Sequence, residues 1–202
     1  MHDTRGRDDL VLPLPPNVPR TPDRPWLRAF ARWLLRLGGW RMEGAFPDLP
    51  KVVLIGAPHS SNWDGFWGFV VKVALGLDIR IIAKQQLFWW PLGVLLTKLG
   101  VIPVNRGAAG NLVDDIVQRF AREERMWIGI APEGTRKRVE RWKAGFWKIA
   151  KGANLVVVPA YFHYPGKVIG IGEPFVLGDD MHADLARIRA WYAPWQGKNR
   201  GV

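Results

Sequence analysis

The chain has 202 residues, of which 48% are hydrophobic and 23% charged, a balance typical of one globular domain with a substantial core. Its formal net charge of +11 indicates an anionic partner, such as nucleic acid, an acidic membrane surface or a phosphorylated or sulfated substrate. The absence of cysteine excludes disulfides, thiolate metal sites and thiol catalysis.

Membrane spanning is not expected, because no apolar run approaches the roughly 18–20 residues that a span requires. The polar and then proline-rich start does not have the pattern of a secretory signal. The chain nevertheless holds 12 tryptophans, a residue that favours both interiors and water–lipid boundaries. We therefore expect any membrane role to be peripheral, on the cytoplasmic face.

The N-terminal part divides into an irregular, proline-rich arm at 1–25 and a basic amphipathic helix at 26–39, which Gly38 and Gly39 end. Three arginines, Arg28, Arg32 and Arg36, lie on one face of this helix. The opposite face carries Trp26, Leu27, Phe30, Trp33, Leu34 and Leu37. The pattern is typical of an interfacial membrane helix, and equally of a surface helix packed on the core. Both interpretations stay open.

Residues 40–195 are predicted to form one α/β domain with a largely parallel central sheet flanked by helices, because strand and helix patterns alternate. Strands are expected at 52–56, 79–82, 101–104, 126–130, 155–161 and 168–171. Helices are expected at 64–76, 91–99, 110–124, 142–152 and 181–192, and the last residues are expected to be frayed. Pro159, inside the strand at 155–161, indicates an edge strand or a bulge if it has only a structural role.

The most informative stretch is 57–65, which follows a buried-strand pattern and leads into a helix. It contains His59 and, five residues later, Asp64. A carboxylate that accepts a hydrogen bond from one imidazole nitrogen fixes the tautomer and leaves the other nitrogen free as a base. The two serines of the chain, Ser60 and Ser61, lie in the same stretch, so a plain helix cap is the structural alternative.

Polar clusters also follow two other predicted strands. Arg106 stands just after 101–104, and Glu133, Gly134, Thr135 and Arg136 stand just after 126–130. In α/β folds, ligands bind at the carboxyl ends of the strands. A glycine, a hydroxyl and several cations together suit the binding of a phosphate.

These motifs, in this order, resemble the glycerolipid acyltransferases, the family of the 1-acylglycerol-3-phosphate acyltransferases. The matching residues are, block by block, His59 and Asp64 of H-x-x-x-x-D; Gly100, Ile102, Val104 and Arg106; Pro132 to Arg136 of P-E-G-T-R; and Val158 with Pro159. The resemblance covers roughly residues 50–175 and departs from the common pattern at Pro58, Ala131 and Lys137, which leaves the acceptor open.

The resemblance implies transfer of an acyl group from an acyl-carrier-protein or coenzyme A thioester, the co-substrate, to a hydroxyl of a lysophospholipid or similar acceptor. His59, oriented by Asp64, would be the catalytic base. Arg106, Glu133, Gly134, Thr135 and Arg136 would engage the acceptor's phosphate and glycerol, with Glu133 holding an arginine or bonding a hydroxyl. No metal or resident cofactor is implied. The partners expected are an anionic membrane surface, the acyl donor and the lipid acceptor.

Two other functions remain as alternatives. A serine acyl hydrolase using Ser60 or Ser61 would lack the G-x-S-x-G elbow, and His59 precedes these serines too closely for ordinary triad geometry. A non-enzymatic basic module that binds lipid or nucleic acid agrees with the net charge. No nucleic-acid motif is present, however, so nucleic acid is not expected as a partner.

Overall fold

The structure, a computed structural model, describes residues 10–104 and 109–202. Within these ranges seven strands form one sheet in the order β1-β7-β6-β2-β5-β3-β4. All neighbouring strands are parallel except β6 and β7, which are antiparallel. The strands are β1 (Arg41–Gly44), β2 (Lys51–Ala57), β3 (Ile79–Lys84), β4 (Val101–Val104), β5 (Met126–Ile130), β6 (Val157–His163) and β7 (Val168–Ile171). The predicted single α/β domain with a largely parallel sheet is therefore confirmed.

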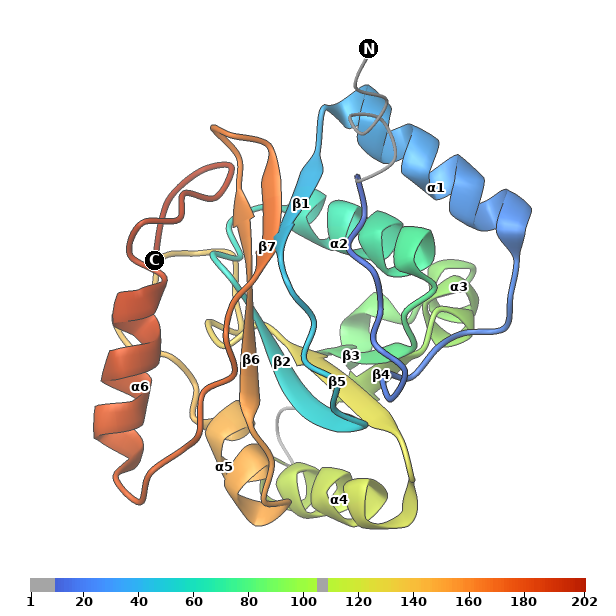
Figure 1. Cartoon of the computed structure of the whole chain (residues 1–202). Helices are drawn as coiled ribbons and strands as arrows, with labels where there is room; N and C mark the ends of the chain where they lie inside the picture. Colours follow the sequence, from blue (N-terminus) through green and yellow to red (C-terminus); the bar gives the residue numbers. More distant parts are fainter. Residues whose placement is uncertain (1–9, 105–108) are drawn as a thin grey trace.

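Helices cover both faces of the sheet (Figure 1). They are α1 (Pro25–Gly38), α2 (Asn62–Leu75), α3 (Leu92–Lys98), α4 (Ala109–Arg122), α5 (Gly145–Gly152) and α6 (Met181–Trp191), with a short 3-10 helix, η2 (Gln85–Leu87). Along β2, alternate side chains enter two hydrophobic clusters, as the two-residue period of a strand requires. Val52 packs with α1 and α2, whereas Val53 and Ile55 pack with α4, α5 and α6.

The part of the N-terminal arm that the structure describes packs on the core. Val18 is fully buried, and the arm pairs with the turn after α2 through hydrogen bonds from Thr21 N to Gly76 O (2.9 Å) and from Asp78 N to Pro19 O (2.9 Å). Helix α1 in turn packs against α2. Its inward side chains are Ala31 and Leu35, and a Cβ on Gly38 would lie 2.4 Å from the Trp67 ring.

Two details differ from the sequence-based expectations. β1 was not predicted, because this strand is only four residues long, is mostly exposed and forms by pairing with β7. The interpretation of Pro159 as a mark of an edge strand is wrong, because β6 lies inside the sheet between β7 and β2. The carbonyl of Pro159 accepts a hydrogen bond from Gly172 N at 2.8 Å, and its register partner on β2 is Ile55.

β2 and β5, which are neighbours in the sheet, form a topological switch point at their carboxyl ends. The helix that follows β2 lies on one face, and the helix that follows β5 lies on the other. The connections after the two strands therefore lead to opposite faces of the sheet. Open α/β sheets bind ligands at such a point. The loop after β2 carries His59, and the loop after β5 carries Glu133 to Arg136.

Candidate active site

The loop after β2 ends in a helix cap that also places the candidate base. Ser61 is the N-cap of α2, and its hydroxyl accepts a hydrogen bond from Trp63 N at 3.2 Å. Asp64, the third residue of the helix, completes the capping box, because its Oδ2 accepts from the backbone N–H of Ser60 and of Ser61, each at 2.7 Å. The cap predicted as the structural alternative is thus present, and the capping carboxylate is the one that faces His59.

His59 points its ring at this carboxylate. Its Nδ1 lies 3.4 Å from Asp64 Oδ2, and its side chain is 30% exposed, whereas that of Asp64 is 1% exposed. In the described part of the chain, Nε2 of His59 has no hydrogen-bond partner. A carboxylate behind Nδ1 and an open Nε2 are the arrangement that a general base needs.

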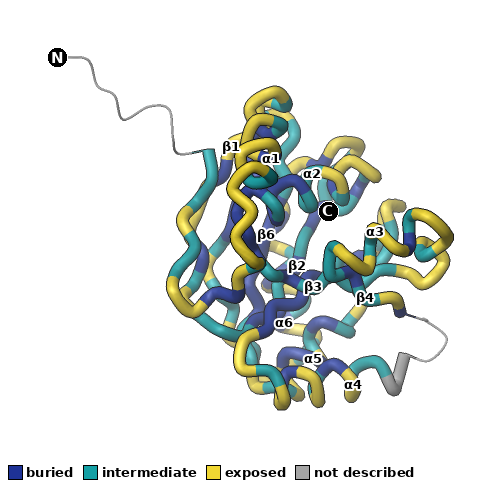
Figure 2. The backbone as a smooth tube through the Cα atoms, turned by 90° about the vertical axis from the view of Figure 1, so that its right-hand side faces the viewer, coloured by how far each residue is buried: buried dark blue, intermediate teal, exposed yellow. Residues whose placement is uncertain are grey.

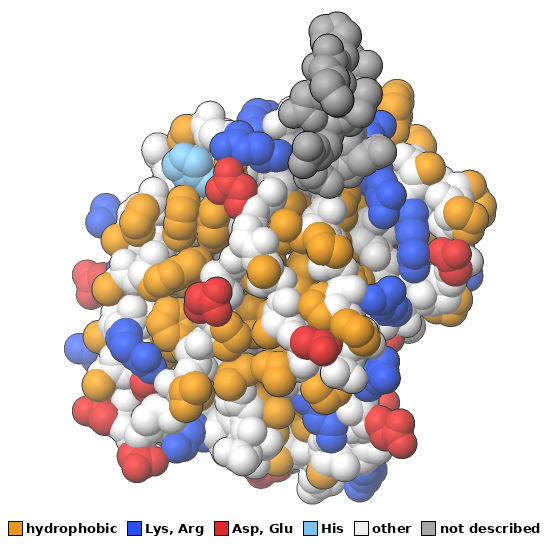
Figure 3. Space-filling view, in the orientation of Figure 1, with side chains coloured by type: hydrophobic (Ala, Val, Ile, Leu, Met, Phe, Trp, Pro, Cys, Tyr) orange, Lys and Arg blue, Asp and Glu red, His pale blue; other side chains and the backbone are white. Residues whose placement is uncertain are grey.

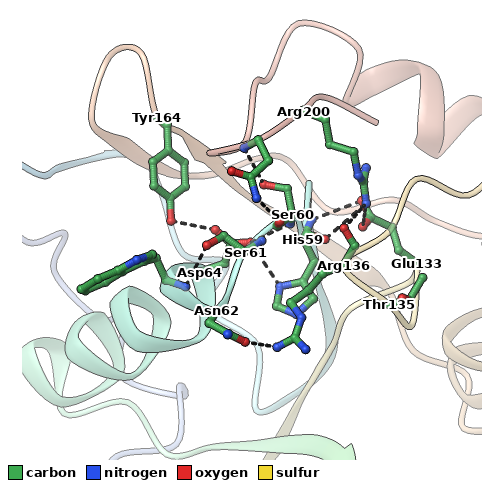
Figure 4. Close-up of polar contacts among 12 residues, drawn as sticks. His59, Ser60, Ser61, Asn62, Asp64, Glu133, Thr135, Arg136, Tyr164 and Arg200 are labelled. Atoms are coloured by element: carbon green, nitrogen blue, oxygen red, sulfur yellow. Dashed lines mark hydrogen bonds and ion pairs between the residues drawn. The ribbon is translucent and has the colours of Figure 1, made fainter.

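Tyr164 is a further partner of Asp64, and it comes from the turn after β6. Its hydroxyl donates to Asp64 Oδ1 at 2.7 Å, as Figure 4 shows. Burial pushes the pKa of Asp64 upward, but the hydrogen bonds from His59, Tyr164 and the two serine amides outweigh it and hold that pKa below its usual value. Burial and the neighbouring carboxylate raise the pKa of the Tyr164 phenol, so this hydroxyl remains a donor.

Glu133 ties the two loops together. Its side chain is 1% exposed, and Oε1 accepts from His59 N at 3.2 Å. Oε2 pairs with Arg200 Nη2 at 2.8 Å, while burial raises the pKa of Glu133 against the opposing effect of Arg200. The same Arg200 nitrogen also donates to the carbonyls of Lys137 (2.9 Å) and His59 (3.3 Å). The arginine that Glu133 holds is therefore Arg200.

The rest of the P-E-G-T-R loop turns back toward α2. Gly134 has φ +65, the left-handed region that favours glycine, and its N–H donates to Ala131 O at 3.0 Å. Thr135 Oγ1 accepts from Lys137 N at 3.3 Å. The exposed Arg136 donates through Nη1 to Asn62 Oδ1 in the first turn of α2. Arg136 therefore lies next to the His59 motif.

Arg106 lies outside the described residues, so the structure does not place it. His59, Asp64, Glu133 and Arg136 are brought together, and Gly134 and Thr135 shape the loop that connects two of them. Tyr164 and Arg200 were missed by the sequence analysis. The expectation of a frayed end is wrong at Arg200, whose side chain is only 18% exposed.

The two serines have structural partners. The buried Ser60 accepts from Asn199 N at its Oγ (3.2 Å) and from Asn199 Nδ2 at its carbonyl (2.8 Å). Ser61 Oγ accepts from Trp63 N. Among the described residues, neither hydroxyl bonds to the imidazole of His59. This geometry does not favour a serine nucleophile.

Among residues 10–104 and 109–202, no group of three or more His, Cys, Asp or Glu side chains is arranged to hold a metal ion. In the same described ranges, none of the helices is both long enough and apolar enough to cross a bilayer.

A family model described as Acyltransferase matches residues 44–163, more than half of the chain. The chain belongs to the acyltransferase family. This acyltransferase also shares its fold with a solved structure, the 1-acyl-sn-glycerophosphate (LPA) acyltransferase PlsC from Thermotoga maritima. The two chains are 16% identical with a TM-score of 0.55, and the match covers 85% of this chain and 80% of that one. No curated protein matches the chain.

Proposed function

We propose that this acyltransferase moves a fatty acyl group from an acyl-carrier-protein or coenzyme A thioester to a hydroxyl of a lysophospholipid or glycerol-phosphate-like acceptor. The observation that carries the proposal is the pairing of His59 with the buried, ionised Asp64 beside the P-E-G-T-R loop. Family membership and the PlsC-like fold support the reaction class. The donor, the acceptor and the two catalytic residues are our assignment.

In the proposed reaction, Nε2 of His59 takes the proton from the acceptor hydroxyl as its oxygen attacks the thioester carbonyl. The tetrahedral intermediate then collapses, the C–S bond breaks, and the leaving thiolate receives the proton from His59. Asp64 stabilises the imidazolium that forms between these two steps. Transfer is direct, because the chain has no cysteine that could hold the acyl group.

We assign the acceptor phosphate to Arg136, together with Arg106 and the Gly134–Thr135 turn. Arg136 is exposed, and its bond to Asn62 directs it toward the loop that carries His59. Glu133 has a different role in this proposal, because its carboxylate already bonds to His59 N and Arg200 and is 1% exposed. Glu133 positions the two loops, and the buried ion pair with Arg200 neutralises the negative charge of Glu133.

We further propose that the chain acts as a peripheral protein on the cytoplasmic face of an anionic membrane, with α1 as a contact. Trp26 (71% exposed), Leu37 (66%), Phe30 (52%) and Trp33 (51%) project from α1, although Ala31 and Leu35 already pack it on the core. Hydrophobic and cationic side chains lie next to one another at the upper right of Figure 3, with an acidic side chain beside them, in the region where Figure 1 draws α1. Aromatic rings beside arginines are typical of an interfacial helix.

The reaction is tested by incubating purified protein with labelled acyl thioesters and a panel of acceptors, and identifying the acylated product by mass spectrometry. An acylated lysophospholipid or glycerol phosphate is the expected product. Acyl release to water, without transfer to any acceptor, would instead indicate a hydrolase.

The contact through α1 is tested separately, by vesicle sedimentation. Changing Trp26, Phe30 and Trp33 to Ser should weaken binding to anionic vesicles and leave transfer to a water-soluble acceptor intact. Unchanged sedimentation would place the contact elsewhere.

A further inference from the structure

The segment between β3 and β4 presents a second exposed apolar surface. Five large hydrophobic side chains project from it: Trp90 (82% exposed), Trp89 (60%), Leu95 (54%), Val94 (50%) and Leu87 (43%). Exposed apolar side chains scattered singly are normal, but a cluster of this kind marks an interaction site. We call this the 87–95 surface.

The 87–95 surface belongs to a folded unit. Gly93 is buried, and its N–H donates to Trp89 O at 2.7 Å. A Cβ on Gly93 would lie 2.6 Å from Phe88 O, so the turn before α3 is closely packed. The hydroxyl of Thr97 donates to Gly93 O at 2.8 Å. These bonds hold the backbone of the turn in place, and both tryptophans remain exposed to solvent.

The charges around this surface favour an anionic partner. Lys84 and Lys98 are both exposed and flank it. The sequence contains no aspartate or glutamate between Asp78 and Asp114. The region around α1 has the same character, because no acidic residue occurs at 24–42, whereas five arginines do. Both surfaces therefore combine exposed aromatic rings with an excess of positive charge, although Asp23 pairs with Arg28 of α1 at 3.1 Å.

The 87–95 surface and the candidate active site belong to the same edge of the sheet. β2, β5, β3 and β4 are consecutive and parallel, so the loops after β2 and β3 leave from the same edge. α1 packs on α2, which begins at the His59 loop. Figure 2 shows α1, α2 and α3 together on one side of the molecule, with exposed backbone positions on α1 and α3.

We propose that the 87–95 surface inserts into the interfacial layer of an anionic bilayer, as a second contact beside α1. Exposed tryptophan suits the lipid–water boundary, and only two lysines accompany a much larger apolar area. This balance favours lipid over an acidic protein as the occupant. Two contacts would fix the orientation of the molecule and turn the edge that carries His59 toward membrane-borne substrates. That consequence rests on the proposed function, whereas the insertion does not.

Because the chain has no cysteine, a single environment-sensitive fluorophore can be placed on Leu95→Cys in the full-length protein. Adding vesicles of phosphatidylcholine and phosphatidylglycerol should shift the label's emission to the blue and increase it. The matched control is Val176→Cys, which is 73% exposed on the segment that leads into α6, on the opposite side of the molecule from α1 (Figure 1). Its label should keep the emission that it has in water.

A companion sedimentation experiment uses the double variant Trp89→Ser, Trp90→Ser, for which the vesicle partition coefficient should fall about tenfold or more. Val176→Ser should sediment like the wild-type protein. A Leu95 label that stays water-like on vesicle-bound protein would overturn the proposal, and so would a blue shift with acyl-carrier protein but not with vesicles. Neither readout needs acyl transfer, so a protein that inserts but transfers no acyl group would refute only the proposed function.

Discussion

Replacing Tyr164 by Phe tests how the candidate base is held. The substitution removes one hydroxyl, which donates to Asp64 Oδ1 at 2.7 Å, and keeps the ring that packs edge-on against Trp40 with centroids 5.0 Å apart. Asp64 then keeps the donors from His59 and from the two backbone amides. The ring packing is preserved, so the change reports on one hydrogen bond to a buried carboxylate.

A hydrogen bond to a charged group contributes about 1.5–3 kcal/mol, and this is the loss of unfolding free energy that we expect at neutral pH. Because the lost hydrogen bond favours the ionised carboxylate, the same substitution should also raise the pKa of Asp64 above its wild-type value. In the wild-type protein the pKa of Asp64 is depressed, so the ionised carboxylate stabilises the folded protein above the ordinary carboxyl pKa. This stabilisation is lost as the pH falls through the pKa that Asp64 has in the folded protein. The difference between variant and wild type should therefore shrink once the pH falls below the raised pKa of Asp64 in the variant.

The assay is urea unfolding of both proteins from neutral pH down to about pH 2, because the pKa of Asp64 in the wild-type protein lies below the ordinary carboxyl value. The control is Tyr192→Phe, because the fully buried Tyr192 hydroxyl donates to the neutral carbonyls of Ile55 (2.8 Å) and Ala160 (3.1 Å). The loss of unfolding free energy caused by Tyr192→Phe should not change with pH over this range. If the cost of Tyr164→Phe is equally independent of pH, the Tyr164 hydroxyl does not act on the charge of Asp64 and this reasoning is refuted.

Two further predictions concern the loops around His59. Arg136→Ala should raise the Michaelis constant for the acceptor about ten- to hundredfold and change that for the donor little. Arg136→Lys should restore acceptor binding only in part, and an equal rise in both constants would reassign Arg136 to the thioester. Arg200→Met should cost about 3–5 kcal/mol in urea unfolding, because it leaves the buried Glu133 carboxylate unpaired. Adding Glu133→Gln should recover much of that loss, and a failure to recover would show that the ion pair is not what joins the loops.

The alternation of strands and helices could be predicted because it rests on local periodicity. β4, β5 and β7 have the predicted bounds, and the other predicted strands differ by one or two residues at their ends. β1 could not be predicted in the same way, because its pairing with β7 joins segments more than a hundred residues apart. The pattern in α1 predicted a helix but not its orientation: Ala31 and Leu35 pack inward, and the large aromatic side chains stay exposed.

The candidate site could be predicted only where its residues are neighbours in sequence. His59 and Asp64 are linked by one cap, so their spacing carries the signal. Tyr164 reaches Asp64 across 100 residues, and Arg200 reaches Glu133 across 67. Each is a single polar residue in a turn or a polar tail, where no periodicity distinguishes a buried partner from a solvated one.

The central claim is that His59, not a serine, carries the reaction. The measurement that tests it most directly is a single-turnover assay of acyl transfer to the acceptor, with His59→Ala compared with the double variant Ser60→Ala, Ser61→Ala. We expect His59→Ala to abolish transfer while remaining folded, although it loses one hydrogen bond to the buried Asp64, and the double serine variant to remain active with lower stability from the lost cap. An inactive double serine variant beside an active His59→Ala would contradict the account.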